Sequence, residues 1–161
     1  MIYEVTGDIL KTKAGAIAHG IASNDHFNQG LALSLKENWP SLAKDFRHYC
    51  HTQNPKAGTV WSWMGSDGKK IINLLTQEAA DSEKQNPHKA TLQNVAHALK
   101  QLKIEIEKDK IKSIAIPKLA TGVGGLAWED VRDLIYKNLN ESSANVYIYT
   151  KYQKDVEATE V

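Results

Sequence analysis

The sequence predicts an α/β protein, a three-layer α/β/α fold with a central mixed sheet. Segments of strand length alternate with segments whose apolar residues recur at helical spacing, a pattern that buries strands between helices. Two neighbouring strand-like segments are joined by strong turn residues, which makes one strand pair antiparallel. The 161 residues contain no linker-like or repeated stretch, so one domain over residues 1–161 is expected.

The first part of the chain predicts two strands and two helices. Residues 2–5 alternate in polarity, and residues 14–18 form a second short apolar run. A helical pattern begins at Leu31 and is interrupted by Pro40, which suits the first turn of a second helix to about Tyr49. The residues of that helix region expected to face the core are Trp39, Leu42 and Phe46.

The rest of the chain predicts a β-hairpin followed by alternating helices and strands. Residues 59–64 and 70–75 flank Gly65-Ser66-Asp67-Gly68, which is typical hairpin turn chemistry. A polar loop over 77–89 follows, and Thr91 is a suitable N-cap for a helix to about Lys108. The last expected elements are a strand over 113–119, a helix over 128–139 and a strand over 145–150.

Composition and charge exclude several classes of protein. Lys and Arg number 20 against 19 Asp and Glu, so a formal net charge of +1 creates no overall field for nucleic acid or an anionic membrane. No apolar run reaches membrane-spanning length. The lone Cys50 cannot form an internal disulfide, and the N-terminus lacks a signal pattern, so a cytoplasmic protein without a membrane partner is expected.

A glycine-rich loop is the most informative candidate site. It follows the apolar run 114–119 and precedes a helical pattern that starts at Trp128. Glycines let backbone N–H groups approach a ligand closely, and a helix N-terminus favours an anion. Ordinary connectors also contain glycines, and the loop matches neither the dinucleotide fingerprint nor the P-loop, so both readings stay open on this segment alone. The loop comprises Thr121, Gly122, Val123, Gly124 and Gly125.

Polar and aromatic side chains at expected strand ends should meet at the same edge of the sheet. Asp8 can only accept hydrogen bonds, which suits the exocyclic amine of adenine, but aspartate is also common in turns. His19 has the chemistry of a general acid or base, although a lone strand-end histidine is more often packed and hydrogen-bonded. Tyr149 and Tyr152 offer faces for a planar base, and tyrosine is also a common strand residue.

Three residues near the end of the second expected helix look like metal ligands at first sight. Their spacing matches no standard zinc signature, and on one short helix His48 and Cys50 point to different faces. No metal site and no cofactor are therefore expected from His48, Cys50 and His51.

Four short motifs follow one another in a characteristic order. They are Gly7-Asp8-Ile9-Leu10, Ala18-His19-Gly20-Ile21-Ala22, Gly30-Leu31-Ala32 and the segment from Ile116 to Trp128. With these motifs the chain resembles, over nearly its whole length, the macrodomain family of ADP-ribose-binding α/β/α modules. The resemblance is greatest to the short macrodomains, which include terminal ADP-ribose protein glycohydrolase, DNA ADP-ribosyl glycohydrolase antitoxins and ADP-ribose 1″-phosphate phosphatases.

The resemblance implies an ADP-ribose site and assigns its residues. Asp8 and Ile9 would recognise adenine, with Tyr149 packed nearby, while Gly30 and Leu31 would offer N–H groups to the phosphates. The distal ribose and diphosphate would be surrounded by Thr121, Gly122, Val123, Gly124 and Gly125. Candidate ligands for the ribose or for a water molecule are Asn24, His26 and Asn28.

The sequence departs from this family at positions that matter for mechanism. Ala22 stands where many macrodomains have a ribose-binding asparagine, and Gln77-Glu78 stand where the short glycohydrolases have a catalytic lysine. Gly124 and Gly125 likewise replace a loop aspartate of the terminal protein glycohydrolase. Hydrolysis of a phosphomonoester needs N–H groups to neutralise charge, a positioned water and one proton-transfer group, for which His19 is the candidate.

The sequence therefore predicts an ADP-ribose-binding macrodomain that hydrolyses an ADP-ribose derivative at the 1″ position of the distal ribose. ADP-ribose 1″-phosphate is the first choice of substrate. The alternative substrate is an ADP-ribosyl group on protein or nucleic acid, and the alternative from another class is a non-catalytic reader of ADP-ribose or of ADP-ribosylated macromolecules.

Overall fold

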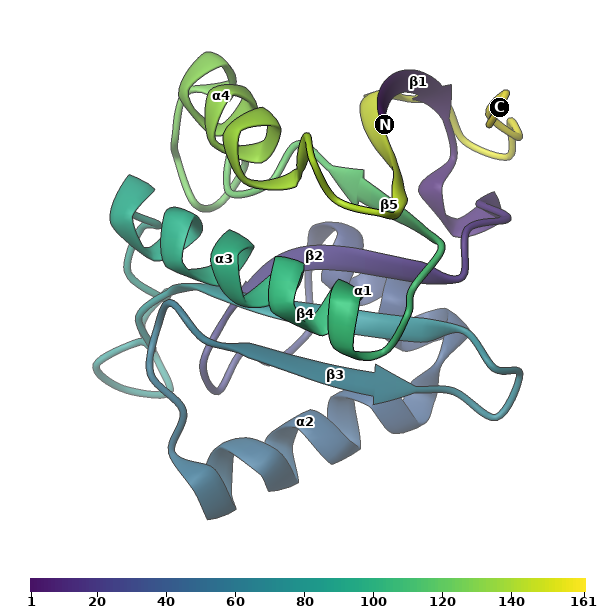
Figure 1. Ribbon diagram of the computed structural model, residues 1–161. Helices are drawn as coiled ribbons and strands as arrows, with labels where there is room; N and C mark the ends of the chain where they lie inside the picture. The colour runs from purple at the N-terminus through teal and green to yellow at the C-terminus, as the bar shows by residue number, and fades with distance from the viewer.

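A computed structural model of the protein describes residues 1–161 and shows a six-stranded sheet with helices on both faces (Figure 1). The strand order is β1-β6-β5-β2-β4-β3, and every neighbouring pair is parallel except β3 with β4. The predicted mixed sheet in an α/β/α arrangement is confirmed. The strands are β1 (Ile2–Gly7), β2 (Ala16–Ala22), β3 (Val60–Met64), β4 (Lys70–Gln77), β5 (Ser113–Pro117) and β6 (Asn145–Tyr152).

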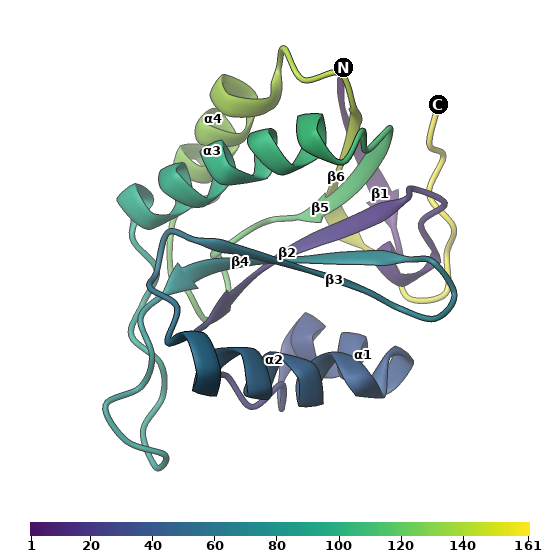
Figure 2. The same cartoon turned by 60° about the horizontal axis from the view of Figure 1, so that its bottom comes forward.

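The helices divide into two layers that bury opposite faces of the sheet (Figure 2). Because alternate side chains of a strand point to opposite faces, Ile71 of β4 packs into one core and Ile72 into the other. The first layer contains the short 3-10 helix η1 (Ile9–Lys11), α1 (Gly30–Asn38) and α2 (Pro40–Gln53). The second contains α3 (Leu92–Lys108) and α4 (Trp128–Leu139).

Local sequence signals locate most of these elements. The hairpin of β3 and β4 forms as predicted, and α4 spans the expected residues. Thr91 caps α3 by accepting a hydrogen bond from the N–H of Asn94 at 3.1 Å. Leu42 and Phe46 of α2 are fully buried as expected, whereas Trp39, the residue before the helix, is only partly buried and donates from its indole to Asp67 at 3.0 Å.

Strand β2 differs from its prediction in a way that affects the site. It ends at Ala22 instead of Ala18, because parallel pairing with β4 continues from Ala16 opposite Lys70 to Ala22 opposite Gln77. His19 therefore lies within the strand and pairs in register with Asn73, so its expected place at the strand end is wrong.

The segment after β6, residues 153–161, returns to the end of β1, where both views show the yellow C-terminal ribbon beside the purple strand (Figures 1 and 2). The N–H of Asp8 donates to the carbonyl of Val156 at 2.7 Å. Gly7 allows this approach, because a Cβ there would lie 2.8 Å from the Val156 oxygen and 2.9 Å from the Ala158 nitrogen. No helix has the length and apolar character needed to cross a membrane.

Candidate ligand-binding site

Two adjoining cavities lie at the carboxyl ends of the parallel strands. The first, of about 260 Å³, is lined by the end of β2, the start of α1 and the loop after β5, and we call it the loop cavity. The second, of about 390 Å³, is lined by the residues after β1 together with Tyr149 and Tyr152, and we call it the tyrosine cavity. Both walls include Gly30, Leu31 and Pro117, so the two cavities adjoin.

Backbone N–H groups without a protein acceptor line the loop cavity. Those of Gly30, Leu31 and Ala32 belong to the first turn of α1, whose N-cap provides no side-chain hydrogen bond. Those of Gly122 through Gly124 come from the loop after β5 and are also unpaired. Unpaired N–H groups at a helix start and in a glycine loop attract anions. The helix that contributes here is α1, since the lining of the cavity ends at Gly124, before α4 begins.

The loop after β5 is held closed by its own backbone. The N–H of Leu126 donates to the carbonyl of Ala120 at 2.9 Å, and that of Gly125 to Gly122 at 3.1 Å. A Cβ at Gly124 would lie only 2.6 Å from the Ala120 oxygen, so a side chain cannot fit there without moving the loop. Glycine at this position thus maintains the shape of the cavity wall.

His19 lies in the wall of the loop cavity but is almost completely buried, with 2% of its surface exposed. Its Nε2 is 2.7 Å from Oδ1 of Asn73, whose Nδ2 donates to the carbonyl of Trp61 at 3.1 Å. This amide orientation makes Nε2 the donor and leaves Nδ1 as an acceptor. Burial lowers the pKa of His19 to about 4, so the ring is neutral at physiological pH.

Asp25, which is not among the residues predicted from the sequence, also lines the loop cavity. The side chain is half-buried, and its Oδ1 accepts a hydrogen bond from the N–H of Phe27 at 2.8 Å. Burial raises the pKa of the Asp25 carboxyl group above its usual value. The available sequence signal was that Asp25 is the only acidic residue in the loop between β2 and α1.

The tyrosine cavity contains Asp8 in a fixed orientation. Asp8 is 3% exposed; its Oδ1 accepts from the N–H of Leu10 at 3.0 Å and its Oδ2 from the N–H of Asp155 at 2.9 Å. Each carboxylate oxygen has a second lone pair, which leaves capacity to accept a hydrogen bond from a ligand. Ile9 and Leu10 line the same cavity.

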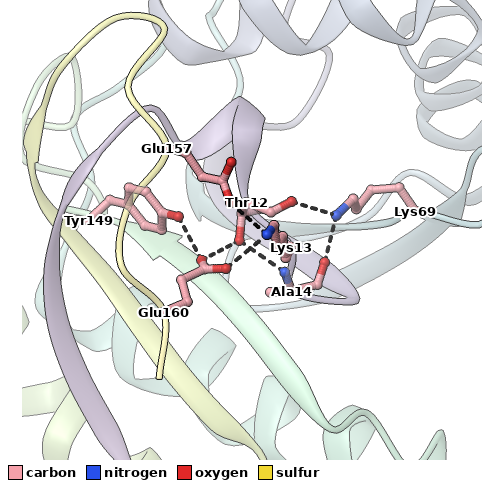
Figure 3. A network of polar contacts seen from close by, with 7 residues as sticks. All are labelled: Thr12, Lys13, Ala14, Lys69, Tyr149, Glu157 and Glu160. Atoms are coloured by element: carbon pink, nitrogen blue, oxygen red, sulfur yellow. Dashed lines mark hydrogen bonds and ion pairs between the residues drawn. The ribbon is translucent and has the colours of Figure 1, made fainter.

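Tyr149 also lines the tyrosine cavity, and Figure 3 shows its contact with the C-terminal segment. Its hydroxyl donates to Oε2 of Glu160 at 2.6 Å. The Glu160 carboxylate also accepts from the hydroxyl of Thr12 and from the N–H of Lys13. Burial, reinforced by the bond to Glu160, raises the pKa of Tyr149, so its hydroxyl stays protonated. Tyr152, 63% exposed, lies at the rim.

Several residues predicted to bind ligand lie outside both cavity walls. In the loop after β2, Asn24 and Phe27 have positive φ angles of 59° and 55°, and buried Phe27 anchors the segment in the core. This path places Asp25 and Gln29 in the wall instead of their neighbours. The residues outside the walls are Asn24, His26, Asn28, Thr121 and Gly125.

The structure brings together no three His, Cys, Asp or Glu side chains that could hold a metal ion. Cys50 is a buried free thiol in the core beneath α2, while His48 and His51 are exposed. Polarity in the site thus comes from backbone amides and from a few isolated side chains.

The Macro domain family profile matches residues 22–135 of the chain. The chain belongs to the Macro domain family. It is 24% identical over 147 residues to ADP-ribose glycohydrolase OARD1 of Homo sapiens, covering 91% of this chain and 89% of the relative. It is 25% identical over 158 residues to the ADP-ribose 1″-phosphate phosphatase of Candida albicans, covering 92% and 99%. The DNA ADP-ribosyl glycohydrolase of Thermus aquaticus is 24% identical over 153 residues, but the match spans only 41% of that protein.

Solved macrodomains share the fold of this chain. The macrodomain of Mycobacterium tuberculosis DarG superposes with a TM-score of 0.81 at 24% identity, covering 92% of this chain and 97% of that one. Thermosipho africanus DarTG in complex with ADP-ribose superposes with a TM-score of 0.78 at 19% identity, covering 99% and 43%. The family resemblance and the fold expected from sequence are both confirmed.

Proposed function

We propose that this macrodomain binds ADP-ribose, with adenine in the tyrosine cavity and the diphosphate and distal ribose in the loop cavity. The observation that carries the proposal is the pair of adjoining cavities, which differ in chemistry. Asp8 can accept a hydrogen bond from an exocyclic amine, and the unpaired N–H groups of α1 and the glycine loop can neutralise a diphosphate. The ADP-ribose complex of Thermosipho africanus DarTG, a protein of the same fold, supports this choice of ligand.

The proposed reaction is hydrolysis of an ADP-ribose derivative at the 1″ position of the distal ribose. Relatives similar over more than nine-tenths of this chain are named as hydrolases of ADP-ribose derivatives, including an ADP-ribose 1″-phosphate phosphatase. Gln77 lines the loop cavity where the resemblance implies a catalytic lysine in the glycohydrolases. A glutamine cannot form a lysine adduct with the sugar, which favours ADP-ribose 1″-phosphate as the substrate.

Two other functions use the same site. The first is release of an ADP-ribosyl group from protein or nucleic acid, which is favoured by the Thermus aquaticus relative named as a DNA ADP-ribosyl glycohydrolase and by the human relative named as an ADP-ribose glycohydrolase. A reader would bind ADP-ribose or ADP-ribosylated macromolecules through the same cavities and release no product.

The decisive experiment is a substrate panel followed by product analysis. The protein is incubated with ADP-ribose 1″-phosphate, O-acetyl-ADP-ribose, ADP-ribosylated protein and ADP-ribosylated DNA, and its affinity for ADP-ribose is measured by calorimetry. Phosphate release from the first substrate supports the proposal, and release from the modified macromolecules supports the glycohydrolase. Binding of ADP-ribose without turnover of any substrate supports the non-catalytic reader. Absence of ADP-ribose binding refutes the ligand assignment.

We place this function in the cytoplasm. The one cysteine of the chain is a free buried thiol, which is usual for proteins of a reducing compartment. Fractionation of cells that express the protein with an epitope tag tests this location.

A further inference from the structure

We propose that Asp25 is the proton-transfer group of this site, the role that the sequence assigned to His19. Its role rests on the proposed hydrolase function and names the side chain that completes the reaction. Asp25 has the only carboxyl group among the 16 residues that line the loop cavity. The other titratable side chains in that lining are His19 and Lys118, so few groups there can move a proton.

The loop between β2 and α1 fixes the position of this carboxyl group. The N–H of Asp25 donates to the carbonyl of Ala22 at 3.2 Å, and Oδ1 accepts from the N–H of Phe27 at 2.8 Å. Phe27 is itself fully buried and packs edge-on against Phe46 with ring centroids 5.5 Å apart. Oδ2 has no hydrogen-bond partner in the protein, so one carboxyl oxygen stays available to a ligand or water in the cavity.

His19 is poorly suited to the same task. Its Nε2 hydrogen is committed to Asn73 at 2.7 Å, and only 2% of the side chain is exposed. Because the ring is neutral, it has no additional proton to give to a leaving group. Its contacts with Asn73 and, at a centroid distance of 6.1 Å, with Phe27 instead help to support the loop that carries Asp25.

The environment of Asp25 shifts its pKa upward. Burial is the largest influence on its pKa and raises it, while the Phe27 N–H and the charge of His26 act in the opposite direction. His26 on the same loop is the charged group that acts on Asp25, and the other titratable side chains in the cavity lining are His19 on β2 and Lys118 after β5. A bound phosphomonoester adds negative charge, which raises the pKa of a carboxyl group beside it further.

The corresponding step with ADP-ribose 1″-phosphate balances in atoms and charge. A water oxygen bonds to phosphorus as the bond between phosphorus and O1″ breaks, and O1″ leaves with the bonding electron pair. Asp25 donates its proton to O1″ as that oxygen leaves, and the phosphate product, which still carries both protons of the attacking water, then returns one of them to Asp25. The products are ADP-ribose and inorganic phosphate, with the carboxyl group restored for the next turnover.

Asp25→Asn is a sharp test because the amide oxygen can still accept the hydrogen bond from Phe27. We expect kcat for ADP-ribose 1″-phosphate to fall by about 100-fold or more, while the Kd for ADP-ribose changes less than about threefold. In the wild type, kcat should fall as pH rises through the pKa of Asp25, and this limb should be absent from the variant. Asp25→Glu, which retains a carboxyl group, should recover part of kcat.

Asp133→Asn is the matched control, since Asp133 is an exposed residue of α4 outside both cavities and undergoes the same chemical change. If the wild type turns over the substrate and the Asp25→Asn variant keeps more than half of its kcat, the role of Asp25 is overturned. The hydrolase function then still stands. Loss of ADP-ribose affinity in that variant overturns the role of Asp25 as well, because the side chain would then serve binding. Absence of wild-type turnover on every substrate overturns the hydrolase function and this role together.

Discussion

The two halves of the site adjoin at Gly30, Leu31 and Pro117 but are built differently. The loop cavity presents mostly backbone N–H groups, whose positions depend on the path of the chain. The tyrosine cavity presents side chains that are held from far along the sequence, as Asp8 is by the N–H of Asp155. Changes in backbone geometry should therefore damage the first cavity, whereas loss of a polar side chain should damage the second together with folding.

The largest expected effect is on folding stability and concerns His19, a buried side chain in the wall of the loop cavity. Its folded-state pKa of about 4 lies below the usual value near 6.5, so the unfolded chain binds more protons between these values. The stability that neutral His19 contributes is present above about pH 6.5 and is lost as pH falls toward 4. The expected loss is about 3 kcal/mol, measured by urea unfolding at a series of pH values.

His19→Gln provides the comparison for this pH dependence, because its amide can still donate to Asn73 and does not titrate. The difference between the two stability curves isolates the contribution of His19 to the pH dependence. His88 contributes equally to both curves and with the opposite sign, because Asp81 raises its pKa. Parallel curves for the two proteins would show that His19 is not protonated on unfolding in this range.

The next effect tests the backbone of the loop cavity. Gly124→Ala places a methyl group within 2.6 Å of the Ala120 oxygen, so the loop must shift. Overpacking of this kind costs about 1–3 kcal/mol. Where binding must restore the loop, ADP-ribose affinity measured by calorimetry should fall by roughly 5- to 150-fold. Gly15→Ala is the control, because a Cβ there would meet its nearest atom at an ordinary 3.8 Å and Gly15 lies outside both cavity walls. An equal loss in both variants would contradict the backbone explanation.

A comparable or smaller loss of stability and of ADP-ribose affinity is expected from a change at Asp8, in the tyrosine cavity. Asp8→Asn replaces one carboxylate oxygen by an NH₂ group, which leaves the N–H of either Leu10 or Asp155 without its acceptor. An unsatisfied buried donor costs about 1–3 kcal/mol, so urea unfolding should show this loss along with weaker ADP-ribose binding. Reduced binding with unchanged stability would mean that the C-terminal segment does not depend on this carboxylate.

The smallest effect is expected for Tyr149→Phe. The variant removes one hydrogen bond to Glu160, which keeps its contacts with Thr12 and Lys13 (Figure 3). Stability should fall by about 1 kcal/mol in urea unfolding. ADP-ribose affinity should change less than about threefold, because the aromatic ring that faces the cavity is retained. A large loss of affinity would instead indicate that the hydroxyl contacts the ligand.

Local patterns in the sequence were sufficient for most of the fold. The turn at Gly65-Ser66-Asp67-Gly68, the Thr91 cap and the start of a helix at Pro40 depend on neighbours within a few residues. The glycine loop also identified one wall of the site, because the need for close backbone approach is visible in composition. The sequence by itself therefore determined the order of elements, the family and the segments that form the cavities.

The tertiary structure decided which side chains face those cavities. β2 reaches Ala22 because β4 pairs beside it, and this pairing sets buried His19 against Asn73. Burial of Phe27 turns Asp25 into the wall, and the return of the chain after β6 brings Asp155 to Asp8. These arrangements depend on contacts between residues far apart in the chain, whose energies a local pattern does not encode.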